Sequence, residues 1–117
     1  MITGIGLDIV ELSRIRRLDT KSPRFRTRIL THYEQAEYDR LTETRKVEYL
    51  AGRFAAKEAF SKAKGTGIGS ECSFQDIEVR KDDKGKPTIY FRGIETGLVS
   101  ITHSKEFAAA QVLLQTI

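Results

Sequence analysis

The chain has 117 residues, of which 39% are hydrophobic and 31% are charged, and we expect one small domain over residues 1–117. A single cysteine, Cys72, excludes an internal disulfide, and two histidines are too few for a histidine-rich metal centre. If a metal binds, this composition favours a hard cation such as Mg²⁺ on carboxylate oxygens. No apolar run of about 18 residues and no signal-peptide pattern is present, so we expect a cytoplasmic protein.

The net charge of +4 arises in the first part of the chain. Residues 1–30 carry seven Lys or Arg and three acids, whereas the remaining 87 residues carry 13 of each. A local excess of positive charge predicts an acidic partner that docks on this segment. Nucleic acid and an acidic protein are both candidates from charge alone.

The first elements of the chain are predicted to be a strand and a basic helix. Residues 2–10 are mostly apolar and predict a strand. Asp8 is unusual within it, because a buried carboxylate without a partner is costly. Asp8 either caps the helix predicted over residues 11–18 or binds a cation.

Two local signals then mark the starts of further helices. Ser22 followed by Pro23 is typical of a helix N-terminus, because proline fits the first helical position. Thr31 and Glu34 fit a capping box, which predicts a helix over residues 32–41. These helices continue the basic segment and then lead into the centre of the chain.

A long helix is predicted over residues 45–64, where apolar residues recur at steps of three and four. Glu58 and Lys62 are one turn apart on it, and so are Arg53 and Lys57. The glycine-rich stretch 65–69 ends the helix and is expected to leave backbone N–H groups free. A helix face that only contacts solvent would show the same charges, so spacing alone leaves both interpretations open.

Strands are predicted for the rest of the chain. The alternation of apolar and polar residues predicts four of them, two forming a hairpin and two following a loop over 93–97: 74–80, 88–91, 98–103 and 107–114. His103 ends the third strand beside Ser104, where it is either an ordinary edge histidine or an anion contact. We therefore predict an α+β domain in which a long central helix packs on an antiparallel sheet.

Four short stretches together are similar to one known family. They are Gly6-Leu7-Asp8-Ile9, the run Gly52-Arg53-Phe54-Ala55-Ala56-Lys57-Glu58-Ala59-Phe60-Ser61-Lys62-Ala63, the loop Gly65-Thr66-Gly67, and Ser100-Ile101-Thr102-His103-Ser104. In this order and at this chain length, they resemble the bacterial holo-[acyl-carrier-protein] synthases, small members of the 4′-phosphopantetheinyl transferase superfamily. The resemblance covers nearly the whole chain, and no motif position departs from the family pattern.

The resemblance implies a reaction and an assembly. The family transfers 4′-phosphopantetheine from coenzyme A to a serine of apo acyl carrier protein, which releases adenosine 3′,5′-bisphosphate and serves fatty acid biosynthesis. Its members are homotrimers with an active site at each subunit interface. Acyl carrier proteins are small and strongly acidic, so the basic segment would have a natural partner.

The resemblance also assigns roles to individual residues. Glu58 and Lys62 would be catalytic, and Asp8 and Glu58 would bind Mg²⁺. Glu58, a metal-bound water and a deprotonated Lys62 are all candidates for the base that accepts the serine proton. Contacts to coenzyme A would come from Arg53, Lys57, Ser61, Lys62, Lys64, Gly65, Thr66, Pro87, His103 and Ser104. Docking of the carrier protein would use Arg14, Arg24, Phe25 and Arg28.

Other classes of function remain as alternatives. A nucleic-acid-binding module could use the basic residues 11–28, although the chain has no tryptophan and no aromatic RNA-binding signature. A structural subunit with a solvated charged helix is a second alternative. A Walker-type nucleotide site is excluded, because the glycines follow the helix and the motif itself is absent. We expect neither nucleic acid nor a membrane as a partner.

Overall fold

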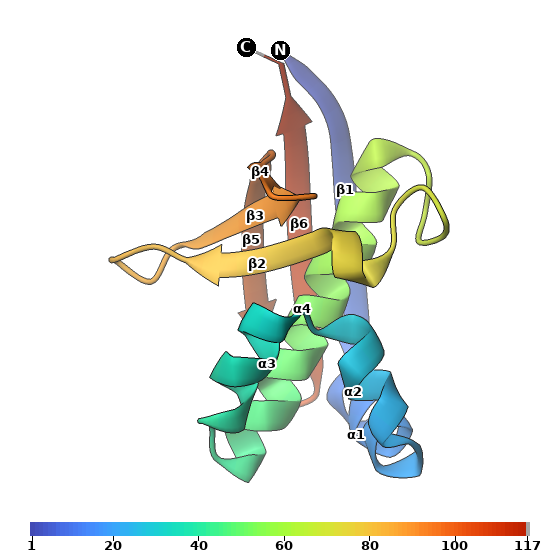
Figure 1. The fold of residues 1–117 in the computed structure, drawn as a ribbon, viewed down its shortest axis with the longest axis vertical. Coiled ribbons are helices and arrows are strands. Elements are labelled where there is room, and N and C mark those ends of the chain that lie inside the picture. Colours follow the sequence, from blue (N-terminus) through green and yellow to red (C-terminus); the bar gives the residue numbers. More distant parts are fainter. Residues whose placement is uncertain (117) are drawn as a thin grey trace.

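A three-stranded antiparallel sheet forms one layer of the structure, a computed structural model that describes residues 1–116 (Figure 1). Its strands are β1 (Ile2–Glu11), β6 (Phe107–Gln115) and β5 (Leu98–His103), with β6 between the other two. The register places Asp8 opposite Ala110. The strands predicted over 2–10, 98–103 and 107–114 are confirmed within two residues at each end.

The long helix α4 (Glu43–Lys64) lies across one face of this sheet (Figure 1). The Thr42 side chain caps its first turn, and Gly65 ends it with a φ of 85°, a conformation that favours glycine. At the β1 side the sheet approaches so closely that a Cβ on Gly6 would lie 1.8 Å from the carbonyl oxygen of Ala59. At the other side Gly52 packs against Ile101 of β5. Small residues therefore let α4 cross from β5 to β1.

Three short helices precede α4 and gather near its N-terminal half (Figure 1). They are α1 (Leu12–Lys21), α2 (Pro23–Ile29) and α3 (His32–Asp39). The predicted Ser22 cap and the predicted Thr31–Glu34 capping box are both present. Asp8 does not cap α1, because the N-cap position is Glu11 and Asp8 lies within β1. The capping interpretation of Asp8 is therefore wrong.

A second antiparallel sheet packs on the same side as α4 (Figure 1). Its strands are β2 (Ile77–Lys81), β3 (Pro87–Phe91) and the two-residue β4 (Ile94–Glu95). The strand predicted over 74–80 begins only at residue 77, because a Ser73–Asp76 capping box makes residues 74–76 a short 3₁₀ helix, η1 (Phe74–Asp76). The predicted loop over 93–97 contains β4, because a turn at Arg92 and Gly93, both with positive φ, sends the chain back along β3.

The core lies between α4 and the two sheets. It is formed by alanine and aromatic residues of α4, branched residues of β2 and β3, alanine and valine of β6, and apolar residues of α1, α2 and α3. Among residues 1–116, no helix is both long and apolar enough to cross a lipid bilayer. The predicted α+β architecture, with a long helix on an antiparallel sheet, is confirmed.

Candidate active site

Asp8 and Lys62 meet where α4 passes β1. The Lys62 Nζ atom donates to Asp8 Oδ1 at 3.0 Å and to the carbonyl oxygen of Leu7 at 3.2 Å. Asp8 shares its sheet face with Gly6, the residue against which α4 packs, since alternate residues of a strand face the same way. The Asp8 side chain is 15% exposed and the Lys62 side chain 52%, so this ion pair is open to ligands.

Glu58, one turn before Lys62 on α4, belongs to the same cluster. Its pKa is raised, first by burial and then by the negative charge of Asp8, whereas Lys62 and Arg14 oppose the shift. The two carboxylates therefore lie close enough to repel each other. A divalent cation would relieve this repulsion, and carboxylate oxygens are the donors that Mg²⁺ prefers. Asp8 and Glu58 thus fit the predicted metal site in charge and chemistry.

The loop after α4 differs from the expectation. The backbone N–H groups of Gly65, Thr66 and Gly67 all donate to the carbonyl oxygen of Ser61, at 3.1–3.2 Å. The prediction that this loop leaves free backbone donors is therefore wrong for these three residues, because they close the C-terminal turn of the helix. Ser61 is fully buried, and its hydroxyl donates to the carbonyl oxygen of Glu58.

A cleft of about 440 Å³ brings together three other predicted site residues, Arg53, Pro87 and His103. Arg53 is only 6% exposed, and its guanidinium stacks on the Tyr49 ring at 4.0 Å. Its Nε and Nη2 atoms have no hydrogen-bond partner within the described part of the chain. Buried donors without partners are costly, so this cleft suits an anionic ligand.

Further residues that line this cleft are charged or aromatic. Arg45 and Tyr49 were not predicted as site residues, although they lie on one stripe of α4 with Arg53 at steps of four. His103 Nε2 lies 3.6 Å from Glu48 Oε1, so that histidine has a carboxylate beside it in the cleft. Arg40 and Lys81 are further cleft residues that local patterns did not single out.

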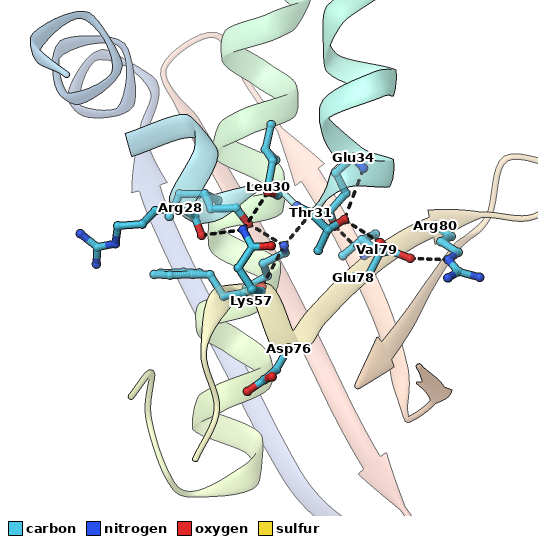
Figure 2. A network of polar contacts seen from close by, with 12 residues as sticks. Arg28, Leu30, Thr31, Glu34, Lys57, Asp76, Glu78, Val79 and Arg80 are labelled. Atoms are coloured by element: carbon cyan, nitrogen blue, oxygen red, sulfur yellow. Dashed lines mark hydrogen bonds and ion pairs between the residues drawn. The ribbon is translucent and has the colours of Figure 1, made fainter. Parts of the chain in front are cut away.

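Lys57 occupies a place that the prediction did not foresee. It is fully buried, and its Nζ atom donates to Glu34 Oε1 at 2.6 Å and to the carbonyl oxygens of Ile29 and Phe74 (Figure 2). Burial lowers the Lys57 pKa, whereas the Glu34 charge opposes that shift. An ammonium group has three N–H donors, and all three are used inside the protein. A direct contact of Lys57 with coenzyme A does not agree with this geometry.

Lys64 and Ser104 are two further predicted site residues, and each makes its contact elsewhere in the fold. The Lys64 Nζ atom sits 4.6 Å from the centre of the Phe91 ring. Ser104 follows β5, and its backbone N–H donates to the carbonyl oxygen of Phe107. Neither residue contacts the Asp8–Lys62 pair in the described structure.

The predicted site residues therefore form two separate groups. The carboxylate cluster, which we define as Asp8, Glu58 and Lys62, lies beside β1, whereas the cleft lies beside Ile101 and His103 of β5. Strand β6 separates β1 from β5. One chain by itself does not bring the two groups together.

The predicted docking residues lie on α1 and α2, and one of them, Arg14, lies near the carboxylate cluster. Arg14, Arg24 and Arg28 are exposed, and Phe25 is half-buried against the Phe54 ring, with 6.1 Å between ring centres. Arg14 lies 6.0 Å from the centre of the same Phe54 ring, and its charge acts on the Glu58 carboxyl. A partner that contacts Arg14 would therefore lie near the Glu58 carboxyl.

Comparison with known proteins identifies similar chains. The model of the 4′-phosphopantetheinyl transferase superfamily matches residues 4–113. A holo-[acyl-carrier-protein] synthase of Bacillus subtilis is 58% identical, and the alignment covers 100% of this chain and 98% of that protein.

Solved structures give the same result. A holo-(acyl-carrier-protein) synthase of Bacillus anthracis in complex with coenzyme A (3′,5′-ADP) is 54% identical with a TM-score of 0.90, covering 100% of this chain and 99% of that one. The Helicobacter pylori holo-[acyl-carrier-protein] synthase in complex with coenzyme A is 35% identical with a TM-score of 0.83, covering 95% and 99%.

Proposed function

Because this chain belongs to the 4′-phosphopantetheinyl transferase superfamily, we propose that it is a holo-[acyl-carrier-protein] synthase. It transfers 4′-phosphopantetheine from coenzyme A to a serine of apo acyl carrier protein and releases adenosine 3′,5′-bisphosphate. The reaction takes place in the cytoplasm and supplies fatty acid biosynthesis. The observation that carries this proposal is the carboxylate cluster, in which Asp8 pairs with Lys62 and the Glu58 carboxyl is influenced by the charge of Arg14 on α1.

The carboxylate cluster binds the reacting diphosphate. Asp8 and Glu58 would hold Mg²⁺, which would neutralise charge on the diphosphate and stabilise the departing phosphate. The Lys62 ammonium, which is half exposed and paired with Asp8, reaches the same phosphates when the substrate binds. The serine hydroxyl must lose its proton as it attacks, and Glu58, a metal-bound water and Lys62 in its neutral amine form are the candidate acceptors.

The cleft binds the other end of coenzyme A. The unpartnered Arg53 donors and the nearby Arg45 suit the 3′-phosphate, because guanidinium groups bind phosphate with fixed geometry. His103 adds a donor at the end of β5, and Pro87 offers an apolar surface to the adenine ring. Lys64, Gly65, Thr66 and Ser104 stay as predicted contacts along the rest of the ligand. Ser61 is fully buried and its hydroxyl donates to the carbonyl oxygen of Glu58, so, as for Lys57, a direct contact does not agree with this geometry.

Self-association would join the two groups into one site. The face of β1 that points away from α4 exposes Ile5, Leu7 and Ile9, each at 61–64%, and Phe107 of β6 adds to it. A row of large exposed apolar residues on a sheet face is typical of an interface. In a homotrimer, the carboxylate cluster of one copy would meet the cleft of the next, so that three complete sites form.

The basic surface of α1 and α2 receives the carrier protein. Arg14, Arg24 and Arg28 attract its acidic helix, and Phe25 provides an apolar anchor between them. This placement would bring the target serine next to Glu58. Charge attraction of this kind weakens with salt, so the transfer rate should fall as ionic strength rises.

Mass spectrometry of the carrier tests the proposed function. The protein is mixed with apo acyl carrier protein, coenzyme A and Mg²⁺, and the carrier is weighed before and after. We expect the gain of one phosphopantetheine, which EDTA and Asp8→Asn both abolish and which Glu71→Gln, at an exposed position, leaves unchanged. No mass gain with any acyl carrier protein would refute the proposal.

A further inference from the structure

The C-terminal end of α2 is held by side chains from two other elements. Gln75 of η1 places its amide Nε2 2.9, 3.2 and 2.8 Å from the carbonyl oxygens of Thr27, Arg28 and Leu30. The remaining carbonyl of this stretch, that of Ile29, accepts from Lys57 Nζ at 2.6 Å. Figure 2 shows the contacts to Arg28, Leu30 and Lys57 in one network. Four consecutive carbonyls therefore receive donors from outside the helix.

These contacts matter because α2 has only seven residues. The last four carbonyl groups of a helix lack partners within it, and a helix this short has little stability of its own. The helix ends without a glycine cap, at Leu30, whose N–H donates to the carbonyl oxygen of Arg26. Its end is therefore fixed by tertiary contacts rather than by its own sequence.

The same contacts connect the basic surface of α1 and α2, where the carrier protein is proposed to dock, to the carboxylate cluster. Arg24, Phe25 and Arg28 all lie on α2, while Lys57 immediately precedes Glu58 on α4. A change in the direction of α2 would move its exposed arginines relative to Glu58. Gln75 and Lys57 thus determine where a docked partner lies in relation to the reacting groups.

We propose that Gln75 is a positioning residue for the carrier protein, which acts by holding the C-terminal end of α2 in the orientation that docking requires. This inference rests on the proposed function, because it assumes that α2 contacts the carrier. Gln75 itself is exposed, whereas Lys57, which holds the same end of α2, is buried in its pair with Glu34. Removing the Gln75 amide therefore leaves the core packing intact.

Kinetics of Gln75→Met test the proposal, since methionine keeps the length of the side chain and lacks both donors. We expect the KM for carrier protein to rise about fivefold, the effect of losing an ordinary hydrogen-bonded contact, with the KM for coenzyme A unchanged. Gln35→Met is the matched control. Its amide donates only to Asp39 within the same helical segment, so its kinetics should equal those of the wild type.

Hydrogen exchange separates positioning from general destabilisation. In Gln75→Met, the amides of α2 should exchange faster, while those of α4 exchange at the wild-type rate and the thermal midpoint stays within the range of the Gln35→Met control. A carrier KM equal to that of the wild type would overturn the inference. So would an equal rise in both KM values, or faster exchange throughout α4, because either result indicates a general loss of structure.

The two proposals fail in different ways. If the wild type transfers nothing to any carrier, the proposed function is refuted and the positioning role with it. If the wild type transfers normally and Gln75→Met is kinetically identical to it, only the positioning role is refuted.

Discussion

Lys62 Nζ lies 3.0 Å from Asp8 Oδ1, although the two residues are 54 positions apart in the chain. The pair forms because α4 approaches β1 at Gly6 with almost no space between backbones. Its ammonium compensates the charge of a carboxylate that is 15% exposed. When a substrate binds, its phosphate could replace Asp8 as the partner of Lys62. A cation bound to that phosphate could replace Lys62 as the partner of Asp8, so the pair can open without leaving either charge unpaired.

Replacing Glu58 by glutamine should separate activity from stability. The rate of transfer should fall by about 100-fold or more, because the variant loses a proposed metal ligand and an ionisable group. The thermal midpoint should stay equal or rise, because burial and Asp8 raise the Glu58 pKa and therefore disfavour its charged form in the folded state. Transfer measured by mass spectrometry and thermal unfolding check both parts; a variant that keeps activity close to that of the wild type would contradict the assignment.

Mixed assemblies should reveal a site shared between copies. One variant combines Asp8→Asn with Glu58→Gln, and the other combines Arg53→Met with His103→Ala, so each should be inactive alone. After the two are dissociated and reassembled together, about a quarter of the interfaces would pair an intact carboxylate cluster with an intact cleft. Transfer should then reappear at about that fraction of the wild-type rate. A mixture as inactive as its components would exclude a shared site.

Reversing the charge of Arg14 should weaken carrier binding selectively. Arg14→Glu places a negative charge on the proposed docking surface, so the KM for carrier protein should rise about tenfold while the KM for coenzyme A changes little. The dependence of carrier KM on salt should also become weaker. Lys84→Glu makes the same charge change at an exposed position in the turn between β2 and β3, and its KM for carrier protein should equal that of the wild type. Equal losses in both KM values would argue against docking at Arg14.

The buried pair of Glu34 on α3 and Lys57 on α4 should contribute strongly to the free energy of unfolding of the protein. Glu34→Ala leaves the Lys57 ammonium without its counter-charge and the Val79 N–H without its acceptor, so the free energy of unfolding should fall by about 3–5 kcal/mol. The double variant with Lys57→Met should lose less than the sum of the two single changes, because no uncompensated charge remains. Urea unfolding of the four proteins measures this; additive losses would show that the pair is not coupled.

The Asp76 carboxylate should stabilise the protein only above acidic pH. Its pKa is lowered below the ordinary 3.8, chiefly by the backbone N–H of Ser73 and also by Arg92. A lowered pKa means that its contribution is complete above the unfolded pKa and is lost as pH falls through the folded value. Asp76→Ala should therefore cost about 1 kcal/mol at pH 7 and progressively less below about pH 4. Thermal midpoints of both proteins from neutral to strongly acidic pH test this, and a difference independent of pH would contradict it.

Much of the secondary structure could be predicted because its signals are local. Ser22 before Pro23, and Thr31 three residues before Glu34, mark helix starts through contacts within a few residues. The error at residues 74–76 comes from a competing local signal, because the Ser73–Asp76 capping box turns the start of a predicted strand into η1. The family motifs also assign Asp8, Glu58 and Lys62 to one site, and the clustering of these three residues agrees with that assignment.

Local sequence patterns suffice for the elements, the basic surface and the family, because spacing, capping and charge are properties of neighbouring residues. The role of each charged side chain of α4 depends instead on tertiary packing. Lys57 and Glu58 are adjacent, but one helical step of about 100° turns Lys57 into the core beside Glu34 and Glu58 toward Asp8. Likewise, β6 lies between β1, beside the carboxylate cluster, and β5, beside the cleft, so the two groups stay apart within one chain. The environment of each of these side chains depends on which elements pack against α4, and the spacing of residues along the sequence carries no information on that packing.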